Sequence, residues 1–226
     1  MKNALVIGAS GLVGKELVKE LLACDGFERV VVFLRTASGI RHPRLTEHVI
    51  DFHAPASWQH LVKGDVLFSA LGTTLKKAGS KKAQHAVDYG LQFAFADIAA
   101  RRRVPAFVLV SSAGASPDAR AFYFRMKGEL ERDVACLPFD RLAILRPGPL
   151  YGEREEQRIG EGIGIFLVRM LNKLGLLRHF RPISGKAVAR AMIQVFFLQN
   201  EARVSYGPRQ LHDLSAGYMT RKNSAL

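Results

Sequence analysis

The chain has 226 residues, of which 48% are hydrophobic and 23% are charged; this composition excludes a disordered protein and suffices for one domain with a buried core. No apolar segment reaches the roughly 20 residues that cross a bilayer, so no transmembrane segment is predicted. The net charge of +13 suits nucleic acid, an anionic membrane surface or a phosphorylated ligand, but no nucleic-acid module accompanies it, and a nucleic-acid partner is therefore disfavoured.

The first predicted strand, Ala4 to Ile7, is apolar and runs into glycines in the order Gly-x-x-Gly-x-x-Gly, just before an amphipathic helix. Gly8 allows a sharp turn off the strand, Gly11 allows the backbone to approach a pyrophosphate, and Gly14 allows the helix to pack closely on the sheet. The free N–H groups at the start of the helix would face the anion. We therefore expect a nucleotide to contact Gly8, Ser10, Gly11, Leu12 and Val13.

Strand-like and helical patterns then alternate along the chain. The further strands are expected at Arg29 to Leu34, Glu47 to Ile50, Asp65 to Ala70, Ala106 to Ser111, and Arg141 to Leu145. Helices are expected at Leu12 to Ala23, Ala83 to Arg103, and Gly185 to Leu198, with Ser184 as the N-cap of the last. This alternation predicts an α/β fold, a doubly wound parallel sheet with helices on both faces, as in the Rossmann fold.

The composition changes after Leu150, where glycines and charged residues lead into an apolar helix near Ile165 to Leu174. Residues 1–226 are predicted to form a single dinucleotide-binding domain, to which 151–226 contribute a small substrate-side lobe. Three glutamates in this stretch belong to a solvated loop or help to bind a polar substrate. They are Glu153, Glu155 and Glu156.

A serine, a tyrosine and a lysine have the spacing of a catalytic site. Ser112 directly follows the fifth predicted strand. Tyr123 precedes Lys127 by four residues, so that both lie on one face of a helix. An ammonium nearby lowers the pKa of a phenol, and a hydroxyl can hold the substrate oxygen against it. We expect Ser112, Tyr123 and Lys127 to be catalytic, with Lys127 also binding the nicotinamide ribose. The alternative is a surface tyrosine beside a solvated lysine.

The residues after the second strand bear on the choice of dinucleotide. NAD-selective folds place an acidic residue there, whereas this chain has Arg35 and Thr36. A guanidinium can bind the 2′-phosphate of NADP through a fork of hydrogen bonds. The sequence therefore predicts NADP(H), unless Arg35 is a surface arginine without a ligand.

These motifs resemble those of the short-chain dehydrogenase/reductase superfamily: Gly8 to Gly14, Val110 to Gly114, and the Tyr123–Lys127 pair. The segment Leu145 to Gly148 resembles the loop after strand six in the extended and atypical branches. Two further segments are similar to the Tat-interacting-protein-like oxidoreductase group, and the resemblance covers about residues 1–200. They are Leu71 to Ser80 and Val87 to Tyr89.

The resemblance implies a dinucleotide along the strand ends and a catalytic trio of Ser112, Tyr123 and Lys127. Many members carry an asparagine where this chain has Asp88, which either holds the lysine charged or caps a helix. The resemblance also implies that the segments Asp51–Phe52, Ala70 to Thr73 and Pro147 to Leu150 line the cofactor. The residues concerned are Asp51, Phe52, Ala70, Leu71, Gly72, Thr73, Pro147 and Leu150.

The sequence thus favours an NADP(H)-dependent oxidoreductase that transfers hydride to or from a small carbonyl or alcohol substrate. The alternative is a non-catalytic protein that binds NADP(H) and regulates a partner, and a sugar-nucleotide epimerase is a less favoured relative. The substrate and the choice between monomer and homodimer stay open.

The cysteines and histidines match no metal or redox spacing, so no metal is predicted. We expect Cys24 and Cys136 to be buried free thiols and the protein to be cytoplasmic. The histidines concerned are His42, His48, His53, His60 and His85.

Overall fold

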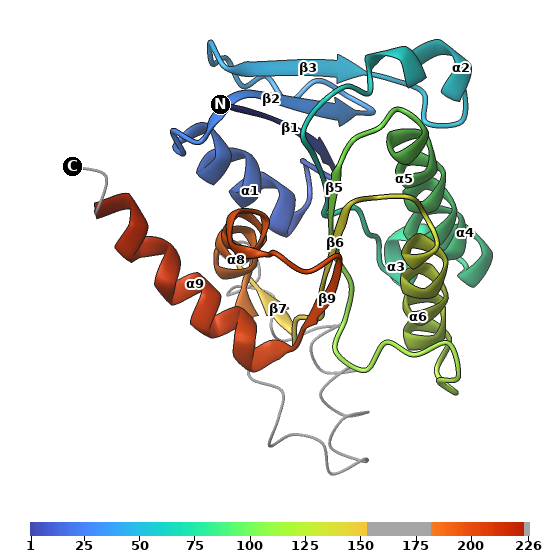
Figure 1. The fold of residues 1–226 in the computed structure, drawn as a ribbon. Helices are drawn as coiled ribbons and strands as arrows, with labels where there is room; N and C mark the ends of the chain where they lie inside the picture. Colours follow the sequence, from blue (N-terminus) through green and yellow to red (C-terminus); the bar gives the residue numbers. More distant parts are fainter. Residues whose placement is uncertain (153–181, 224–226) are drawn as a thin grey trace.

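Seven parallel strands form the central sheet in a computed structural model that describes residues 1–152 and 182–223. Their order across the sheet is β3-β2-β1-β4-β5-β6-β9, and every neighbouring pair is parallel (Figure 1). The predicted doubly wound α/β fold is therefore confirmed. The strands are β1 (Lys2–Ile7), β2 (Phe27–Leu34), β3 (Leu45–Val49), β4 (Val66–Ser69), β5 (Ala106–Val110), β6 (Arg141–Leu145) and β9 (Arg203–Tyr206).

Helices cover both faces of this sheet (Figure 1). One face carries α1 (Leu12–Leu22), α8 (Gly185–Leu198) and α9 (Pro208–Asn223), and its core includes Leu17 and Met192. The other face carries α2 (Pro55–Trp58), the short helix η1 (Gln59–Leu61), α5 (Gln92–Arg101) and α6 (Phe122–Ala135). Because helices bury both faces, the central strands read as continuous apolar runs rather than alternating ones.

Most of the elements expected from the sequence occur within a few residues of their predicted limits. The β6 strand and the helix α8 have the predicted bounds, and the Ser184 hydroxyl accepts a hydrogen bond from the Ala187 N–H at 3.1 Å, which makes Ser184 the predicted N-cap. The seventh strand β9 was not predicted. It alternates between exposed and half-buried residues at the edge of the sheet and lacks the apolar run of a central strand.

The helix predicted from Ala83 to Arg103 is divided into three segments. A one-turn helix α4 (Lys81–His85) leads into a π-helical segment η2 (Ala86–Leu91), which continues as α5. A further short helix, α3 (Leu75–Ala78), precedes them. Apolar periodicity does not reveal a π-helical turn, because the turn adds a residue without changing the kinds of residue on the buried face.

The described part of the C-terminal region belongs to the same sheet and helix layers. A two-stranded sheet joins β7 (Leu150–Tyr151) to β8 (Ile183–Ser184), and α8 then packs against α1. The helix expected near 165–174 and the three glutamates Glu153, Glu155 and Glu156 lie outside the described residues.

The prediction of buried thiols is wrong. Cys24 is only partly buried and Cys136 is exposed, because each follows the end of a helix rather than standing on its buried face. Among the helices of the described ranges, none is long and apolar enough to cross a membrane.

Candidate active site

The turn between β1 and α1 has the geometry of an anion-binding turn. Gly8 has a φ of +81°, and a Cβ placed on it would lie 2.4 Å from the Ala70 carbonyl carbon. A Cβ on Gly14 would lie 2.0 Å from the Gly8 carbonyl oxygen, so α1 can approach the sheet only with glycine there. Gly11 is the N-cap of α1, and the first turn carries no acidic side chain. The first N–H groups of the helix have no acceptor within it and are therefore available to an anion.

Buried polar residues concentrate near the carboxyl ends of β4 and β5. Eleven polar or charged residues are buried in the described part of the chain. Eight of them lie at the end of β4, directly after β5, or on the helices α4, η2, α5 and α6. Buried polar groups are costly, so such a concentration is typical of a functional site. We call these eight the polar cluster: Ser69, Gln84, Asp88, Gln92, Ser111, Ser112, Lys127 and Glu131.

Hydrogen bonds connect the part of the polar cluster that lies on β4, η2 and the start of α5. The Ser69 hydroxyl donates to Gln92 Oε1 at 2.7 Å, and Gln92 Nε2 donates to the Asp88 carbonyl oxygen at 2.6 Å. The Asp88 carboxylate accepts a hydrogen bond of 2.6 Å from the Thr73 N–H. The π-helical turn thus places Asp88, which is 1% exposed, against the loop that follows β4. π-helical turns of this kind occur frequently at functional sites.

The structure brings Ser112, Tyr123 and Lys127 to this cluster. Tyr123 lies in the first turn of α6 and forms a hydrogen bond with the Ser112 side chain, while Lys127 follows one turn later and is 3% exposed. The charge of Asp88 acts on both Tyr123 and Lys127. The three side chains therefore lie in one site near Asp88, in which Ser112 and Lys127 are buried and Tyr123 is half-buried.

The expectation that an ammonium lowers the pKa of the phenol is wrong for this arrangement. Burial, together with the negative charge of Asp88, raises the pKa of Tyr123 to about 12, although the hydrogen bond with Ser112 acts in the opposite direction. Burial also holds the pKa of Lys127 below its ordinary value, against the carboxylates of Asp88 and Glu131. Burial likewise raises the pKa of Asp88 above its ordinary value, against the charge of Lys127 and the hydrogen bonds from Thr73 and Gln84. Both groups therefore lie in a medium that disfavours charge.

The sequence analysis did not predict an ion pair between Glu131 and Arg146, which lies beside the site and connects α6 to the segment after β6. Glu131 is 5% exposed and accepts two hydrogen bonds of 3.1 Å from Arg146 Nε, and a third from Arg146 Nη2. The pair joins α6 to the segment after β6, where the Pro147 carbonyl accepts a hydrogen bond of 2.9 Å from the Ala113 N–H. The sequence could have indicated Glu131, because Tyr123, Lys127 and Glu131 follow one another at intervals of four residues and therefore share one face of the helix.

Two pairs of the predicted cofactor residues lie after the strands β2 and β3. Arg35 and Thr36 follow β2 directly and are exposed. Asp51 is exposed, and its carboxylate accepts a hydrogen bond of 2.9 Å from the His53 N–H. Phe52 is 9% exposed and packs among core aromatic rings. Arg35, Thr36 and Asp51 are thus exposed polar residues at the carboxyl ends of the strands, whereas Phe52 is part of the core.

The other predicted cofactor residues follow β4 and β6. Ala70 and Leu71 are half-buried and form the backbone against which Gly8 packs, while Gly72 is exposed. The Thr73 N–H is engaged by Asp88. Pro147 is buried, and Leu150 packs against the core beside α8. These segments all lie at the carboxyl ends of parallel strands, the edge at which ligands bind in this architecture.

The donor groups at this edge fit a dinucleotide. The uncapped start of α1 can receive its phosphates, and Arg35 stands where a ribose phosphate could be bound. In addition, the buried Ser111 hydroxyl has no hydrogen-bond partner within the described residues. A buried polar atom without a partner indicates a group that a ligand or water completes.

Comparison with known proteins identifies relatives and a shared fold. The chain is 35% identical to "Protein FMP52, mitochondrial" of Eremothecium gossypii, over 89% of this chain and 92% of that protein. It is 38% identical to the FMP52 protein of Saccharomyces cerevisiae, over 82% and 81% of the two chains. Among solved structures, the Bordetella bronchiseptica enzyme WbmH in complex with NAD⁺ matches with a TM-score of 0.68 at 18% identity, over 96% of this chain and 80% of that one. The likeness to WbmH shows the fold, which is the Rossmann fold.

The relatives' names contradict one expectation. Both FMP52 proteins are named as mitochondrial, so the predicted cytoplasmic location is wrong. That prediction depended on cysteine content and on composition, and neither of these determines the subcellular location of a protein. The model of the HIM1 family matches residues 44–180, more than half of the sequence. Together with the FMP52 relatives, this match shows that the chain belongs to the HIM1 family.

Proposed function

We propose that the protein is an NADP(H)-dependent oxidoreductase of the short-chain dehydrogenase type, in the Tat-interacting-protein-like group. One observation carries the proposal: Ser112, Tyr123 and Lys127 converge in a buried polar cluster at the edge of the sheet that also holds the glycine turn. A nucleotide bound at that turn and extended along the strand ends would reach the cluster. WbmH, which has the same fold, is described in complex with NAD⁺, and this supports a dinucleotide.

The residues after the strands would hold the cofactor. The N–H groups of Leu12 and Val13 would bind the pyrophosphate, Arg35 the 2′-phosphate, and Lys127 the nicotinamide ribose. The bound nicotinamide supplies or accepts the hydride. Of residues 151–226, which are proposed to contribute the substrate side, β9 and α8 belong to the main fold, so this contribution would come from the segment that begins at β7.

The chain's own side chains would position and protonate the substrate. The Ser112 hydroxyl holds the substrate oxygen by a hydrogen bond, and the Tyr123 hydroxyl exchanges a proton with that oxygen. The positive charge of Lys127 would offset part of the cost of the phenolate once the proton has left, against the burial that raises the pKa of Tyr123. Because the site is largely shielded from solvent, these hydrogen bonds and charge interactions would be stronger there than in water.

The test is a screen of small carbonyl compounds for NADPH consumption by the purified protein. Tyr123→Phe should lower kcat/KM by at least about 100-fold, because general acid catalysis contributes that much or more. Tyr89→Phe is the matched control. Tyr89 lies on η2 and donates a hydrogen bond of 2.7 Å to Asp133 Oδ2, so this variant removes a phenol from the same pair of helices but not from the cluster.

Two outcomes would count against the proposal. Unimpaired turnover by Tyr123→Phe would exclude the proposed role of the phenol. Tight NADPH binding without turnover of any compound, with a partner protein bound differently in the presence of NADPH, would instead favour a cofactor-binding regulator.

A further inference from the structure

The sheet ends at β9, and this edge strand carries unpaired backbone groups. In a parallel pair, alternate residues direct both their N–H and their carbonyl group toward the same neighbouring strand. N–H groups of β6 and of the residue after it donate to the carbonyls of Ala202 and Tyr206, at 2.8 and 2.9 Å. The even-numbered residues of β9 therefore face β6. Arg203 and Ser205 direct their backbone groups outward, where no strand of the described ranges pairs with them.

The opposite edge strand, β3, is less suited to pairing with another strand. Charged side chains on an edge strand disfavour such pairing. β3 has Glu47 at its centre, and the carboxylate accepts a hydrogen bond of 3.1 Å from the Ser38 N–H and another from the Ser38 hydroxyl. The last three residues of β9, from Val204 to Tyr206, carry no charge.

A groove of about 410 Å³ lies beside β9. It is formed by β9, α8 and α9, and its apolar lining includes Leu198, Tyr206 and Leu214. Leu198 is 42% exposed. Gln194 also lines the groove and is 6% exposed, but its side-chain amide makes no hydrogen bond within the described part of the chain. A buried amide without a partner indicates a group whose hydrogen bonds are completed by something bound there.

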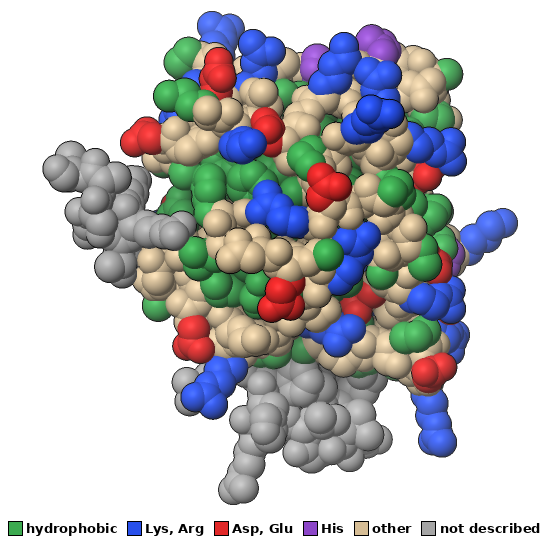
Figure 2. Space-filling model, viewed as in Figure 1, with side chains coloured by type: hydrophobic (Ala, Val, Ile, Leu, Met, Phe, Trp, Pro, Cys, Tyr) green, Lys and Arg blue, Asp and Glu red, His purple; other side chains and the backbone are tan. Residues whose placement is uncertain are grey.

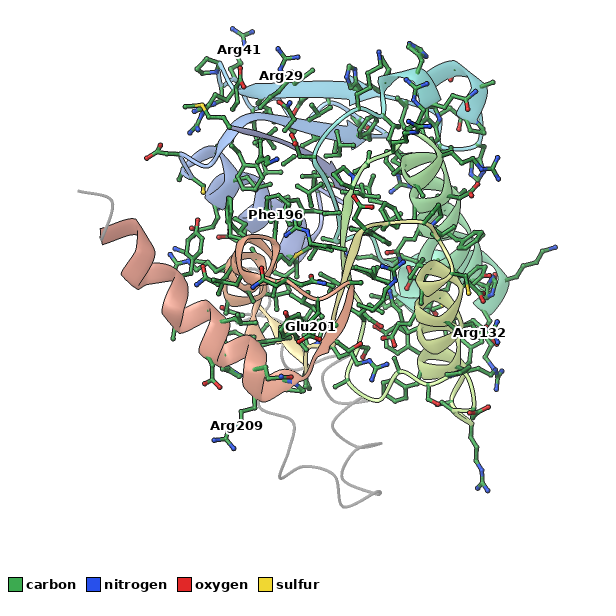
Figure 3. All side chains as sticks on the ribbon, viewed as in Figure 1. Arg29, Arg41, Arg132, Phe196, Glu201 and Arg209 are labelled. Atoms are coloured by element: carbon green, nitrogen blue, oxygen red, sulfur yellow. The ribbon has the colours of Figure 1, made fainter. Side chains whose placement is uncertain are left out.

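Two exposed charges of opposite sign stand at the two ends of β9. Glu201 precedes the strand by two residues, and Arg209 follows it by three. Neither side chain forms an ion pair with another described residue, and Arg209 points away from the body of the molecule (Figure 3). In an antiparallel pair of identical strands, the end of each strand lies beside the start of the other. Glu201 of each copy would then lie near Arg209 of the other copy.

We infer that β9 pairs with β9 of a second copy of this chain, antiparallel and about a two-fold axis, to form a homodimer with a continuous sheet. With Val204 on the axis, Arg203 of each copy faces Ser205 of the other. Hydrogen bonds between them then use every outward N–H and carbonyl group of the two strands. The groove becomes part of the interface and adds apolar area, which hydrogen bonds alone do not supply.

The distribution of charge selects a second copy over an extended segment of another protein. A two-fold interface uses the same surface on both subunits, so that surface must be complementary to itself. This edge meets the condition, because it carries an acid at one end and a base at the other.

Sedimentation velocity of the purified full-length protein, from about 1 to 100 μM, measures the dimer dissociation constant. Ser205→Pro removes an outward N–H and leaves the hydrogen bonds to β6 intact, since proline is tolerated on the outward side of an edge strand. Each dimer loses this hydrogen bond in both copies, so the dissociation constant should rise at least about tenfold.

Val49→Pro is the matched control on the opposite edge. The Ile50 N–H donates to the Leu34 carbonyl at 2.8 Å, so the preceding residue, Val49, directs its backbone groups outward as Ser205 does. This variant should leave the dissociation constant unchanged. Circular dichroism establishes that both proline variants are folded.

A charge exchange tests the pairing without altering the backbone. Glu201→Arg and Arg209→Glu each bring like charges together across the axis, and each should raise the dissociation constant about 3- to 10-fold. The double variant restores opposite charges and should return the dissociation constant to within about twofold of the wild-type value.

Four results would overturn the inference. The first is a wild-type protein that remains a monomer at every concentration. The second is a dimer that Ser205→Pro does not weaken, and the third is equal weakening by Val49→Pro. The fourth is a double charge variant that associates no more tightly than either single variant.

Discussion

Arg35 has the position and exposure expected of a residue that binds a 2′-phosphate. It follows the last residue of β2 and is exposed, at the same edge of the sheet as the turn before α1. We expect Arg35→Asp to lower the affinity for NADPH relative to NADH by about 10- to 100-fold, the worth of a charge-assisted hydrogen bond. Fluorescence titration with each reduced cofactor measures the ratio.

Arg41→Asp serves as the control for this substitution. Arg41 belongs to the same connection between β2 and β3, is exposed, and points away from the body of the molecule (Figure 3). It changes the net charge by the same amount, so a purely long-range effect of charge would appear in both variants. An affinity ratio that is unaltered in Arg35→Asp, or equally altered in both, would exclude the assignment of Arg35.

At the same scale, sequence spacing predicted the common helix face of Tyr123 and Lys127, but it did not predict the pKa shift of Tyr123. The four-residue interval between Tyr123 and Lys127 fixes their common face, because helix geometry depends on sequence separation alone. The sign of the Tyr123 pKa shift depends instead on burial and on Asp88, a residue that lies in another helix. Sequence spacing does not reveal the dielectric environment that distant elements create around a group.

Among the elements, α6 carries most of the proposed chemistry, and one partly buried ion pair contributes to holding it in place beside its core contacts. The Glu131–Arg146 pair ties α6 to the segment that follows β6. We expect Glu131→Gln to lower the free energy of unfolding by about 2 kcal/mol, less than for a fully buried pair, because Arg146 is partly exposed and water screens it. Urea denaturation followed by the fluorescence of Trp58, the single tryptophan, measures the loss.

A surface pair of the same chemistry is the reference for this prediction. Asp97 and Arg101 form an ion pair across one turn of α5, with the arginine side chain 77% exposed. Asp97→Asn should change the stability little, because exposed pairs contribute little to it. Equal losses in Asp97→Asn and Glu131→Gln would mean that the buried pair does not brace α6.

The elements that the sequence failed to predict share a physical cause. The strand β9 buries its residues only in part, and the π-helical turn η2 keeps the apolar pattern of an ordinary helix. Apolar patterning detects elements that bury a face, so the central strands β1, β4 and β5 were found with small errors at their ends. The placement of Asp88 needed the extra residue of η2 and could not be predicted from periodicity.

Across the whole molecule, part of the basic charge has a structural use. Three arginines donate hydrogen bonds to backbone carbonyls at or just after the C-terminal ends of helices, on both faces of the sheet. They are Arg44 at α1, Arg141 at α8 and Arg203 at α6. Cations are favourable at such ends, where carbonyls lack partners and the helix dipole is negative. On the face shown in Figure 2, basic side chains are spread out with acidic side chains among them. A net charge of +13 is therefore not by itself the signature of a ligand.

Arg44 allows this structural use of charge to be measured. Its guanidinium donates to the Phe27 carbonyl at 2.8 Å and to the Cys24 carbonyl at 3.1 Å, and it also reaches the Leu22 carbonyl. Arg44→Lys retains the charge beside the helix but replaces the planar fork by a single ammonium, which cannot serve all these acceptors at once. We expect it to lower the free energy of unfolding by about 1 to 2 kcal/mol, the worth of one or two hydrogen bonds.

The same substitution at Arg29, an exposed residue of β2 that points outward in Figure 3, should leave the stability unchanged within the error of urea denaturation. If Arg44→Lys is as stable as the wild-type protein, water serves these carbonyls equally well. Arg44 would then not stabilise the end of its helix. The excess positive charge would need another explanation, such as an anionic partner.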